Sequence, residues 1–337
     1  MNLNNDDKLR LGTTARKIVE NGKGILALDE TSKSLEKRFA LRNVTNTFEN
    51  RVKFRDIILS TKNLGKYLGG VIMNEEMLNE RSELQNKSFV EILQEQAISI
   101  GIKLDKGLIE FRDNEKVSVG LEDLEKRVKN SKFKTAEFAK WRSVFKVDEV
   151  LPSFDCIEEN CVVLARYARI CQENKLVPIV EPEILWEGEY TLKRAQQVTN
   201  NVLSSLISHL NIQGVYIPGI IIKLGYVTPG RSNTQVYSYQ DIGISTFTSL
   251  ISTVPVGISG VVFLSGGHNF NDSMEFLNAI NKQKGKRTWN LSYSYGRAFS
   301  DNVLDVWNNK DENIEKAQEK LINLLEIASQ AIQGKLE

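Results

Sequence analysis

The chain has 337 residues, of which 44 are Lys or Arg and 43 are Asp or Glu, giving a formal net charge of +1. This balance gives no reason to expect nucleic acid or a membrane surface as a partner. The length allows one large core or two domains, and the sequence contains no run of 18 apolar residues that would predict a membrane-spanning helix.

The N-terminal segment is polar at first and then has helical periodicity. Its opening letters, MNLNNDDKLRLG, lack the apolar core of a secretory signal, so we expect a cytoplasmic protein. Apolar side chains recur at helical spacing over residues 7–21 and predict a helix. The short apolar run GILALD, residues 24–29, follows directly and predicts a strand.

Seven more short apolar runs follow, and stretches of helical periodicity separate them. The clearest predicted helices are 156–174, 190–210 and, at the end of the chain, 313–333. The eight predicted strands are 24–29, 67–73, 101–105, 138–147, 176–185, 219–225, 260–266 and 289–296. Near-continuous apolar strands that alternate with helices indicate a parallel sheet covered by helices.

Eight such units in a chain of this length predict an α/β fold, a single (β/α)8 TIM barrel with extra N- and C-terminal helices. We expect one domain over residues 1–337, because no Pro/Gly-rich linker or break in composition divides the chain. A doubly wound open sheet is the main alternative. It is less favoured because no Gly-rich dinucleotide fingerprint follows the first strand.

The cysteines and histidines are few and scattered. Cys156, Cys161 and Cys171 show no CxxC spacing, so a disulfide framework is not expected. His209 falls within a helical pattern and is interpreted as structural, whereas His268 follows two glycines and could belong to a site. Two histidines without a cysteine cluster argue against a catalytic zinc site, and we expect neither a metal nor an organic cofactor.

Ionisable or anion-binding residues stand where most of the predicted strands end. Lys223 ends the apolar run GIIIK, where loss of hydration lowers the pKa of an amine and favours the neutral nucleophile of Schiff-base chemistry. For a lone lysine at a strand end, extension to solvent is the simpler interpretation. In a barrel, however, the carboxyl ends of all strands meet at one rim. The other residues at this rim are Asp29, Lys103, Asp105, Lys140, Arg142, Glu181, Glu183, Ser265, Gly266, Gly267, Gly296 and Arg297.

The spacing of these residues suggests what they do. Lys140 and Arg142 share one face of their strand because they are two residues apart, and the same holds for Glu181 and Glu183. A pair of carboxylates can serve as general acid and base, although the pair could also simply form ion pairs with Lys140 and Lys103.

An anion-binding end is also predicted. The small residues of FLSGGHN can turn backbone N–H groups towards an anion, and YGRA on the next strand adds the guanidinium of Arg297. Barrels often bind phosphate with the loops after strands 7 and 8. A plain glycine turn is the simpler interpretation of SGG, and Arg297 favours the phosphate site.

At these positions the chain closely resembles the class I (Schiff-base) fructose-bisphosphate aldolases. The matching segments occur in the family's order from about residue 15 to residue 330. They are GKGILALDE, GIKLDKG, FAKWRSV, LARYARICQENKLVPIVEPEIL, the lysine strand with VTPG, GVVFLSGG and SYGRA.

The resemblance implies a metal-independent lyase that cleaves fructose 1,6-bisphosphate reversibly to dihydroxyacetone phosphate and glyceraldehyde 3-phosphate. By the same resemblance Lys223 forms the Schiff base, Glu181 transfers protons with support from Glu183 and Lys140, and Asp29 acts on the hydroxyl whose collapse breaks the C–C bond. The phosphorylated sugar is expected to be bound at its 1-phosphate by Ser265, Gly266, Gly296 and Arg297, and at its distal phosphate by Ser34, Arg38, Lys103 and Arg142. A homo-oligomer, a tetramer, is also implied.

The chain departs from the family's usual pattern at several places. Leu224-Gly225-Tyr226 replace Pro-Asn-Met after the lysine, and His268 replaces a usual Gln. The sequence ends in Gly334-Lys335-Leu336-Glu337, where many members have a mobile tail finishing in Tyr, so we expect enamine proton exchange to use Glu181 or water. Another Schiff-base sugar-phosphate enzyme, such as a transaldolase, and a scaffold protein that retains the site are the alternative functions.

Overall fold

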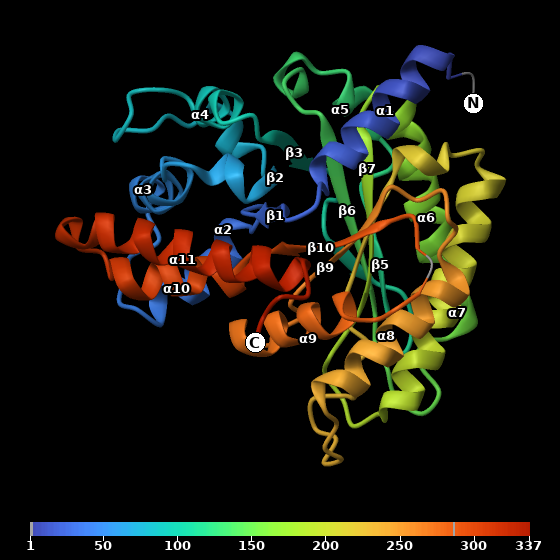
Figure 1. Ribbon diagram of the computed structural model, residues 1–337. Helices are drawn as coiled ribbons and strands as arrows, with labels where there is room; N and C mark the ends of the chain where they lie inside the picture. The colour runs from blue at the N-terminus through green and yellow to red at the C-terminus, as the bar shows by residue number, and fades with distance from the viewer. Residues whose placement is uncertain (1–2, 286) are drawn as a thin grey trace.

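Eight short apolar strands close into a parallel barrel at the centre of the computed structural model, which describes residues 3–285 and 287–337 (Figure 1). Their order around the barrel is β1-β10-β9-β8-β7-β6-β3-β2. The strands are β1 (Gly24–Ala27), β2 (Leu68–Met73), β3 (Ser99–Lys103), β6 (Phe138–Phe145), β7 (Val177–Ile184), β8 (Ile221–Leu224), β9 (Gly260–Phe263) and β10 (Asn290–Tyr295). The predicted (β/α)8 fold is confirmed, and several strands end earlier than expected.

Helices surround the barrel, and polar N-caps begin many of them. Ser88 and Ser238, for example, form capping boxes with the residues three positions on. The helices are α1 (Asn5–Ile18), α2 (Ser32–Ala40), α3 (Phe48–Leu59), α4 (Phe89–Glu95), α5 (Leu124–Val128), α6 (Phe154–Glu173), α7 (Leu192–Ile212), α8 (Tyr239–Thr253), α9 (Phe270–Asn281), α10 (Arg297–Trp307) and α11 (Ile314–Ile332). Short 3₁₀ turns lie at Leu64–Lys66, Glu76–Asn79, Ser131–Phe133, Ile217–Gly219 and Asp311–Asn313.

A small antiparallel hairpin was not predicted. It consists of β4 (Leu108–Glu110) and β5 (Lys116–Ser118), and it lies between β3 and β6 in the chain. Its turn contains Asp113 and Asn114 with φ of 50° and 63°. Asn and Asp tolerate this left-handed region better than other side chains. Strands of three residues are too short for an alternating pattern to reveal them.

Side chains fill the barrel from its amino-terminal end. Leu11, Ala15 and Ile18 of α1 pack in one buried cluster with the inward-facing residues of the strands, so α1 closes this end. Phe138 belongs to the same cluster, and a Cβ on Gly101 would lie 2.1 Å from its ring. Position 101 therefore requires glycine.

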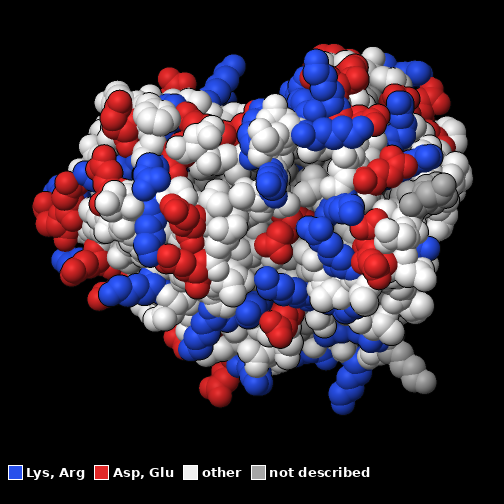
Figure 2. All heavy atoms as spheres, turned by 90° about the horizontal axis from the view of Figure 1, so that it is seen from above, with Lys and Arg blue, Asp and Glu red and all other residues white. Residues whose placement is uncertain are grey.

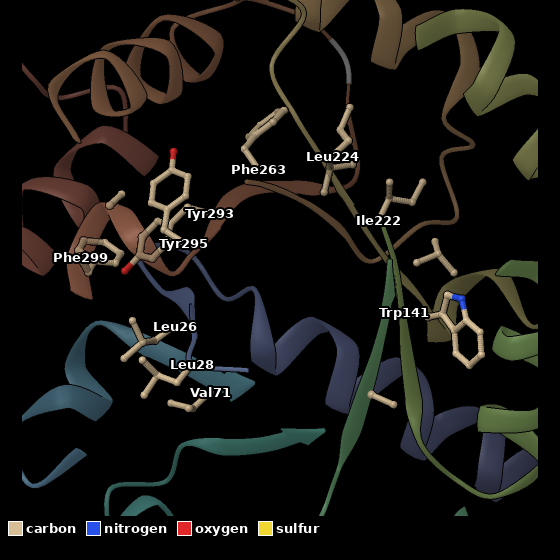
Figure 3. Packing of buried hydrophobic residues seen from close by; sticks show 14 of the residues in the cluster. Leu26, Leu28, Val71, Trp141, Ile222, Leu224, Phe263, Tyr293, Tyr295 and Phe299 are labelled. Atoms are coloured by element: carbon tan, nitrogen blue, oxygen red, sulfur yellow. The ribbon is translucent and has the colours of Figure 1, made fainter. Parts of the chain in front are cut away.

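The second and larger core lies between the barrel and its helices. Figure 3 shows Tyr293, Tyr295 and Phe299 gathered where β10 meets α10, and the ring centroids of Tyr293 and Phe299 are 5.3 Å apart. Ile222 and Leu224 belong to this outer core, whereas Ile221 lies in the cluster inside the barrel. The alternation along β8 therefore directs Lys223 to the inside.

The structure also shows the state of the cysteines and the distribution of surface charge. Cys156, Cys161 and Cys171 are buried free thiols. Over the part of the chain that is described, no helix combines the length and apolar character needed to cross a membrane. On the face drawn in Figure 2, acidic and basic side chains of the described residues are interspersed, without one extended patch of either sign.

The last residues lie against α9 (Figure 1). The carbonyl oxygen of Leu336 accepts hydrogen bonds from Asn278 Nδ2 at 3.1 Å and from Lys282 Nζ at 2.9 Å, and its N–H donates to Asn278 Oδ1 at 3.2 Å. Because Asn278 and Lys282 stand at the carboxyl end of α9, this tail is bound at the end of the helix far from the carboxyl ends of the strands.

Candidate active site

The carboxyl ends of the strands surround a cavity of about 520 Å³. Its walls include most of the residues that the sequence analysis singled out as candidate site residues. They are Asp29, Ser34, Lys103, Lys140, Arg142, Glu181, Glu183, Lys223, Ser265, Gly266, Gly296 and Arg297. A larger groove of about 1200 Å³ runs beside α11, but its lysines, Lys62 and Lys66, are exposed and therefore remain hydrated. The charged side chains that line the smaller cavity, and not its volume, identify it as the candidate site.

The period of two along the strands explains how charged groups come to face the interior. Phe138, Ile179 and Ile221 all lie in the apolar cluster inside the barrel. Two residues further along β6, β7 and β8, on the same faces, stand Lys140, Glu181 and Lys223. Each of these three side chains is at least 95% buried. The apolar cluster inside the barrel is therefore followed, towards the carboxyl ends of the strands, by these three buried charged side chains.

These groups form one connected set of ion pairs. Lys223 Nζ lies 3.1 Å from Glu181 Oε1, and Glu181 Oε2 lies 3.2 Å from Lys140 Nζ. Lys140 Nζ also contacts Asp29 Oδ2 at 2.7 Å. A single buried cation, Lys140, therefore joins two carboxylates, one of which touches the candidate nucleophile.

The charges in this set determine its protonation. Burial raises the pKa of Glu181, but the cations Lys140 and Lys223 outweigh burial and hold that pKa below its usual value. Burial likewise raises the pKa of Asp29, but the charges of Lys140 and Lys223 outweigh burial and lower it below the usual value. Burial lowers the pKa of Lys140, yet Asp29 and Glu181 together raise it well above its usual value. Both carboxylates are thus ionised, and Lys140 is a cation, at neutral pH.

The outer ion pairs differ partly from expectation. Glu181 pairs with Lys140 as the simpler interpretation proposed, but Glu183 contacts Arg142 Nε instead of Lys103. Lys103 pairs with Asp105 at 3.1 Å. The strand order explains this difference, because β6 lies between β7 and β3 and places Arg142 next to Glu183.

Arg38 and Gly267 are candidates that the structure does not bring into the cavity wall. Arg38 is held between two helices. It is 7% exposed, its Nε donates to Asp301 Oδ1 at 2.8 Å, and an Nη atom donates to Ser300 Oγ at 2.8 Å. It also contacts Glu30. These bonds join α2 to α10, so in this conformation Arg38 connects helices instead of facing the cavity.

Sequence reasoning missed Glu30, which lines the cavity next to Asp29. Burial raises the pKa of its carboxyl above the usual value, although Arg38 opposes the shift. Its position directly after Asp29, at the end of GILALDE, was the available signal. Leu108, from the unpredicted hairpin, also contributes to the wall.

Small residues and an arginine form the anion-binding end of the cavity. After β9 the backbone turns at Gly266 and Gly267, whose φ values are +60° and +97°. Gly296 precedes α10, and a Cβ there would lie 2.7 Å from Ala27 O. Arg297 opens α10, where the unpaired N–H groups of a helix start favour anions. This end can therefore hold a phosphate.

Groups of three or more His, Cys, Asp or Glu side chains arranged to hold a metal ion are absent from the described ranges. The arrangement offers instead a buried amine, a carboxylate in contact with it, a second carboxylate bridged by a cation, and an anion site. These are the requirements for forming an iminium on a phosphorylated carbonyl compound and moving protons around it.

Comparison with known proteins agrees with this chemistry. Residues 10–337 match the family described as "Fructose-bisphosphate aldolase class-I". The chain is 53% identical to a fructose-bisphosphate aldolase of Encephalitozoon cuniculi, over 98% of both chains. It is 41% identical to human fructose-bisphosphate aldolase C, over 99% of this chain and 93% of the human one.

Solved structures give the same result. A ternary co-crystal structure of Plasmodium falciparum fructose-bisphosphate aldolase with TRAP and a small-molecule inhibitor is 42% identical in sequence. It matches with a TM-score of 0.97 and covers 100% of this chain and 98% of the other.

Proposed function

Since the chain belongs to the class I fructose-bisphosphate aldolase family, we propose that its reversible cleavage of fructose 1,6-bisphosphate proceeds through an iminium on Lys223. The observation that carries this assignment is the buried Nζ of Lys223, directed into the cavity and 3.1 Å from Glu181. An iminium withdraws electrons from the bond to be broken and so takes the place of a metal as electron sink.

The steps follow from the positions of the groups. Lys223 first passes a proton to Glu181, and its Nζ then attacks the C2 carbonyl. A proton on the attacking nitrogen moves to the former carbonyl oxygen, and the resulting carbinolamine loses its hydroxyl as water to give the iminium. Glu181, in contact with Nζ, accepts the amine's proton and returns one to the departing hydroxyl. Lys140 holds the carboxylate of Glu181 in place through their ion pair. Glu183 contacts Arg142, whose positive charge also lowers the pKa of Glu181.

Asp29 has the position for the bond-breaking step. Its lowered pKa keeps it an ionised base, able to take the proton of the C4 hydroxyl. The C3–C4 electrons then pass to the iminium, which becomes an enamine, and the aldehyde leaves as glyceraldehyde 3-phosphate. A proton added at C3 and hydrolysis of the iminium release dihydroxyacetone phosphate and regenerate Lys223.

The two phosphates would lie at opposite sides of the cavity. Ser265, Gly266, Gly296 and Arg297 line the cavity and would surround the 1-phosphate. Ser34, Lys103 and Arg142 also line it and would surround the distal phosphate. Arg38 would reach the distal phosphate only after leaving Asp301. The homotetramer that the resemblance implied and the cytoplasmic location expected from the N-terminal segment also belong to this proposal. Exposed apolar side chains such as Val150 and Phe154 are compatible with an oligomer.

Purified protein is expected to cleave fructose 1,6-bisphosphate at the same rate before and after treatment with EDTA, because Lys223 supplies the electron sink. A coupled assay of dihydroxyacetone phosphate formation measures this rate. Activity that EDTA abolishes and added zinc restores would contradict the proposal. Cleavage of other sugar phosphates without cleavage of this substrate would favour the transaldolase-like alternative.

Removing residues 334–337 is expected to change the rate of cleavage by less than about threefold, under ~1 kcal/mol in barrier. Leu336 is bound to Asn278 and Lys282, at the far end of α9, and the removed residues contain no phenol that could assist the enamine. Steady-state kinetics of the shortened chain test this expectation. A tenfold loss would show that the tail takes part in the reaction.

A further inference from the structure

We propose that Trp186 and His268 are positioning residues that hold the loop between β9 and α9, residues 264–269, in the shape that binds the 1-phosphate. This inference rests on the proposed role of Ser265 and Gly266 in that loop. It concerns one aromatic residue within the loop, His268, and one packed beside it, Trp186, neither of which lines the candidate active-site cavity.

The loop depends on outside support because its own backbone is glycine-rich. Gly266 and Gly267 both adopt left-handed conformations, and the N–H of His268 donates to Ser265 O at 2.9 Å to close the turn. Turns of this kind aim backbone N–H groups at an anion. Glycine also has the greatest freedom to leave such a conformation, so the geometry must be held by neighbouring groups.

The ring of His268 is fixed by three surrounding side chains. It stacks on Trp186 with ring centroids 3.8 Å apart and meets the edge of Phe276 at 5.1 Å. Its Nε2 lies 3.5 Å from Thr228 Oγ1. Trp186 follows β7, Thr228 follows β8 and Phe276 lies on α9, so one imidazole connects the segments that follow Glu181 and Lys223 to the phosphate loop.

Trp186 also covers the loop directly. A Cβ placed on Gly267 would lie 3.5 Å from Cε3 of the indole, which shows that the ring packs against the glycine backbone. Arg231, after β8, lies over the same indole at 5.5 Å from the ring centroid. The indole is thus packed between the loop, His268 and a cation.

The electrostatics indicate that His268 acts by packing. Burial lowers its pKa to about 4, although Asp272 opposes the shift, and so the ring is neutral at physiological pH. A neutral imidazole adds no charge to balance a phosphate, and that function remains with Arg297. The role of His268 is therefore to hold the loop in place.

The test compares the two substrates of the condensation reaction. In Trp186→Ala and His268→Ala, the KM for dihydroxyacetone phosphate, whose phosphate occupies this loop, should rise about tenfold or more. The KM for glyceraldehyde 3-phosphate should stay within about twofold, and kcat within about threefold. A general loss of structure would affect both substrates alike.

Further variants distinguish a loss of local packing in the loop from a general loss of structure. His268→Phe keeps a flat ring against Trp186 and should restore the KM for dihydroxyacetone phosphate to within about threefold of the parent enzyme. The double variant Trp186→Ala/His268→Ala should be little worse than either single one, because the two residues act as a unit. His209→Ala, which removes the histidine on α7 that contacts Glu158, is the matched control and should change neither KM.

The outcomes distinguish this inference from the function on which it rests. If the parent enzyme neither cleaves the bisphosphate nor forms an adduct on Lys223, the proposed function fails. If the parent enzyme is active while both alanine variants keep the KM for dihydroxyacetone phosphate within twofold, the positioning role is wrong. Equal increases in both KM values, without recovery in His268→Phe, would also overturn it.

Discussion

Replacing Lys223 with methionine should lower the rate of fructose 1,6-bisphosphate cleavage by a factor on the order of 10⁴ or more, about 5 kcal/mol in barrier. Methionine fills a similar volume in the buried position but has no amine with which to form the iminium. Nearby Lys140 cannot substitute, because its pKa is raised by Asp29 and Glu181 and its Nζ is held by both. Single-turnover kinetics measure the loss.

Chemical trapping identifies the residue directly. Borohydride reduction in the presence of dihydroxyacetone phosphate, followed by peptide mass mapping, should give one covalent adduct, on Lys223. Lys62→Met, which changes an exposed lysine beside α11, is the matched control and should retain full activity and the adduct. An adduct on Lys140 or Lys103 alone would refute the assignment, and no adduct at all would refute the Schiff-base route.

Replacing Glu181 with glutamine should lower kcat about 10²- to 10⁴-fold, the range typical of a lost acid–base group. Glutamine preserves the shape of the side chain beside Lys223 but can neither accept nor return the proton. Borohydride should still trap the Lys223 adduct, more slowly. Because the pKa of Glu181 is lowered, the carboxylate persists below the usual Glu value of about 4.3, so its titration should cause no loss of parent activity between about pH 7 and 5.

The control for this variant is a carboxylate of similar chemistry outside the cavity. Glu158→Gln, on α6, removes the partner of Ser205 and His209 and should leave kcat unchanged. Rates of Lys223 adduct formation and of overall turnover should be measured together. A Glu181→Gln enzyme that keeps more than a tenth of the parent kcat would exclude Glu181 as the principal proton-transfer group.

The fold and most of the cavity wall could be predicted because they depend on local patterns. Alternation along a strand decides which side chains face inward, and a closed parallel barrel brings the carboxyl ends together, so Lys140, Glu181 and Lys223 could be placed from sequence. Residues near the strand ends could be assigned to the site even where the predicted strand boundaries differ from those in the structure. Asp29 and Ser265, for instance, lie just beyond β1 and β9.

The parts that were missed depend on distant contacts. Arg38 is predicted as a phosphate ligand, and its hydrogen bond to Asp301, 263 residues away in the sequence, could not be read from any local pattern. Glu183 pairs with Arg142 and not with Lys103 because β6, which carries Arg142, is the neighbour of β7. Strands as short as Leu108–Glu110 carry too few residues for a period to appear.

The pairing of β1 with β10 has a consequence for the order in which the molecule becomes active. Ile25 lies beside Ser294, so the barrel closes only when segments from both ends of the chain meet. Asp29, immediately after β1, faces a Lys140 that comes more than a hundred residues later, and Arg297 comes later still. During synthesis from the ribosome, no partial chain lacking β10 can complete the phosphate end of the cavity. The anion-binding end of the cavity is therefore complete only once the last strand of the barrel has joined the first.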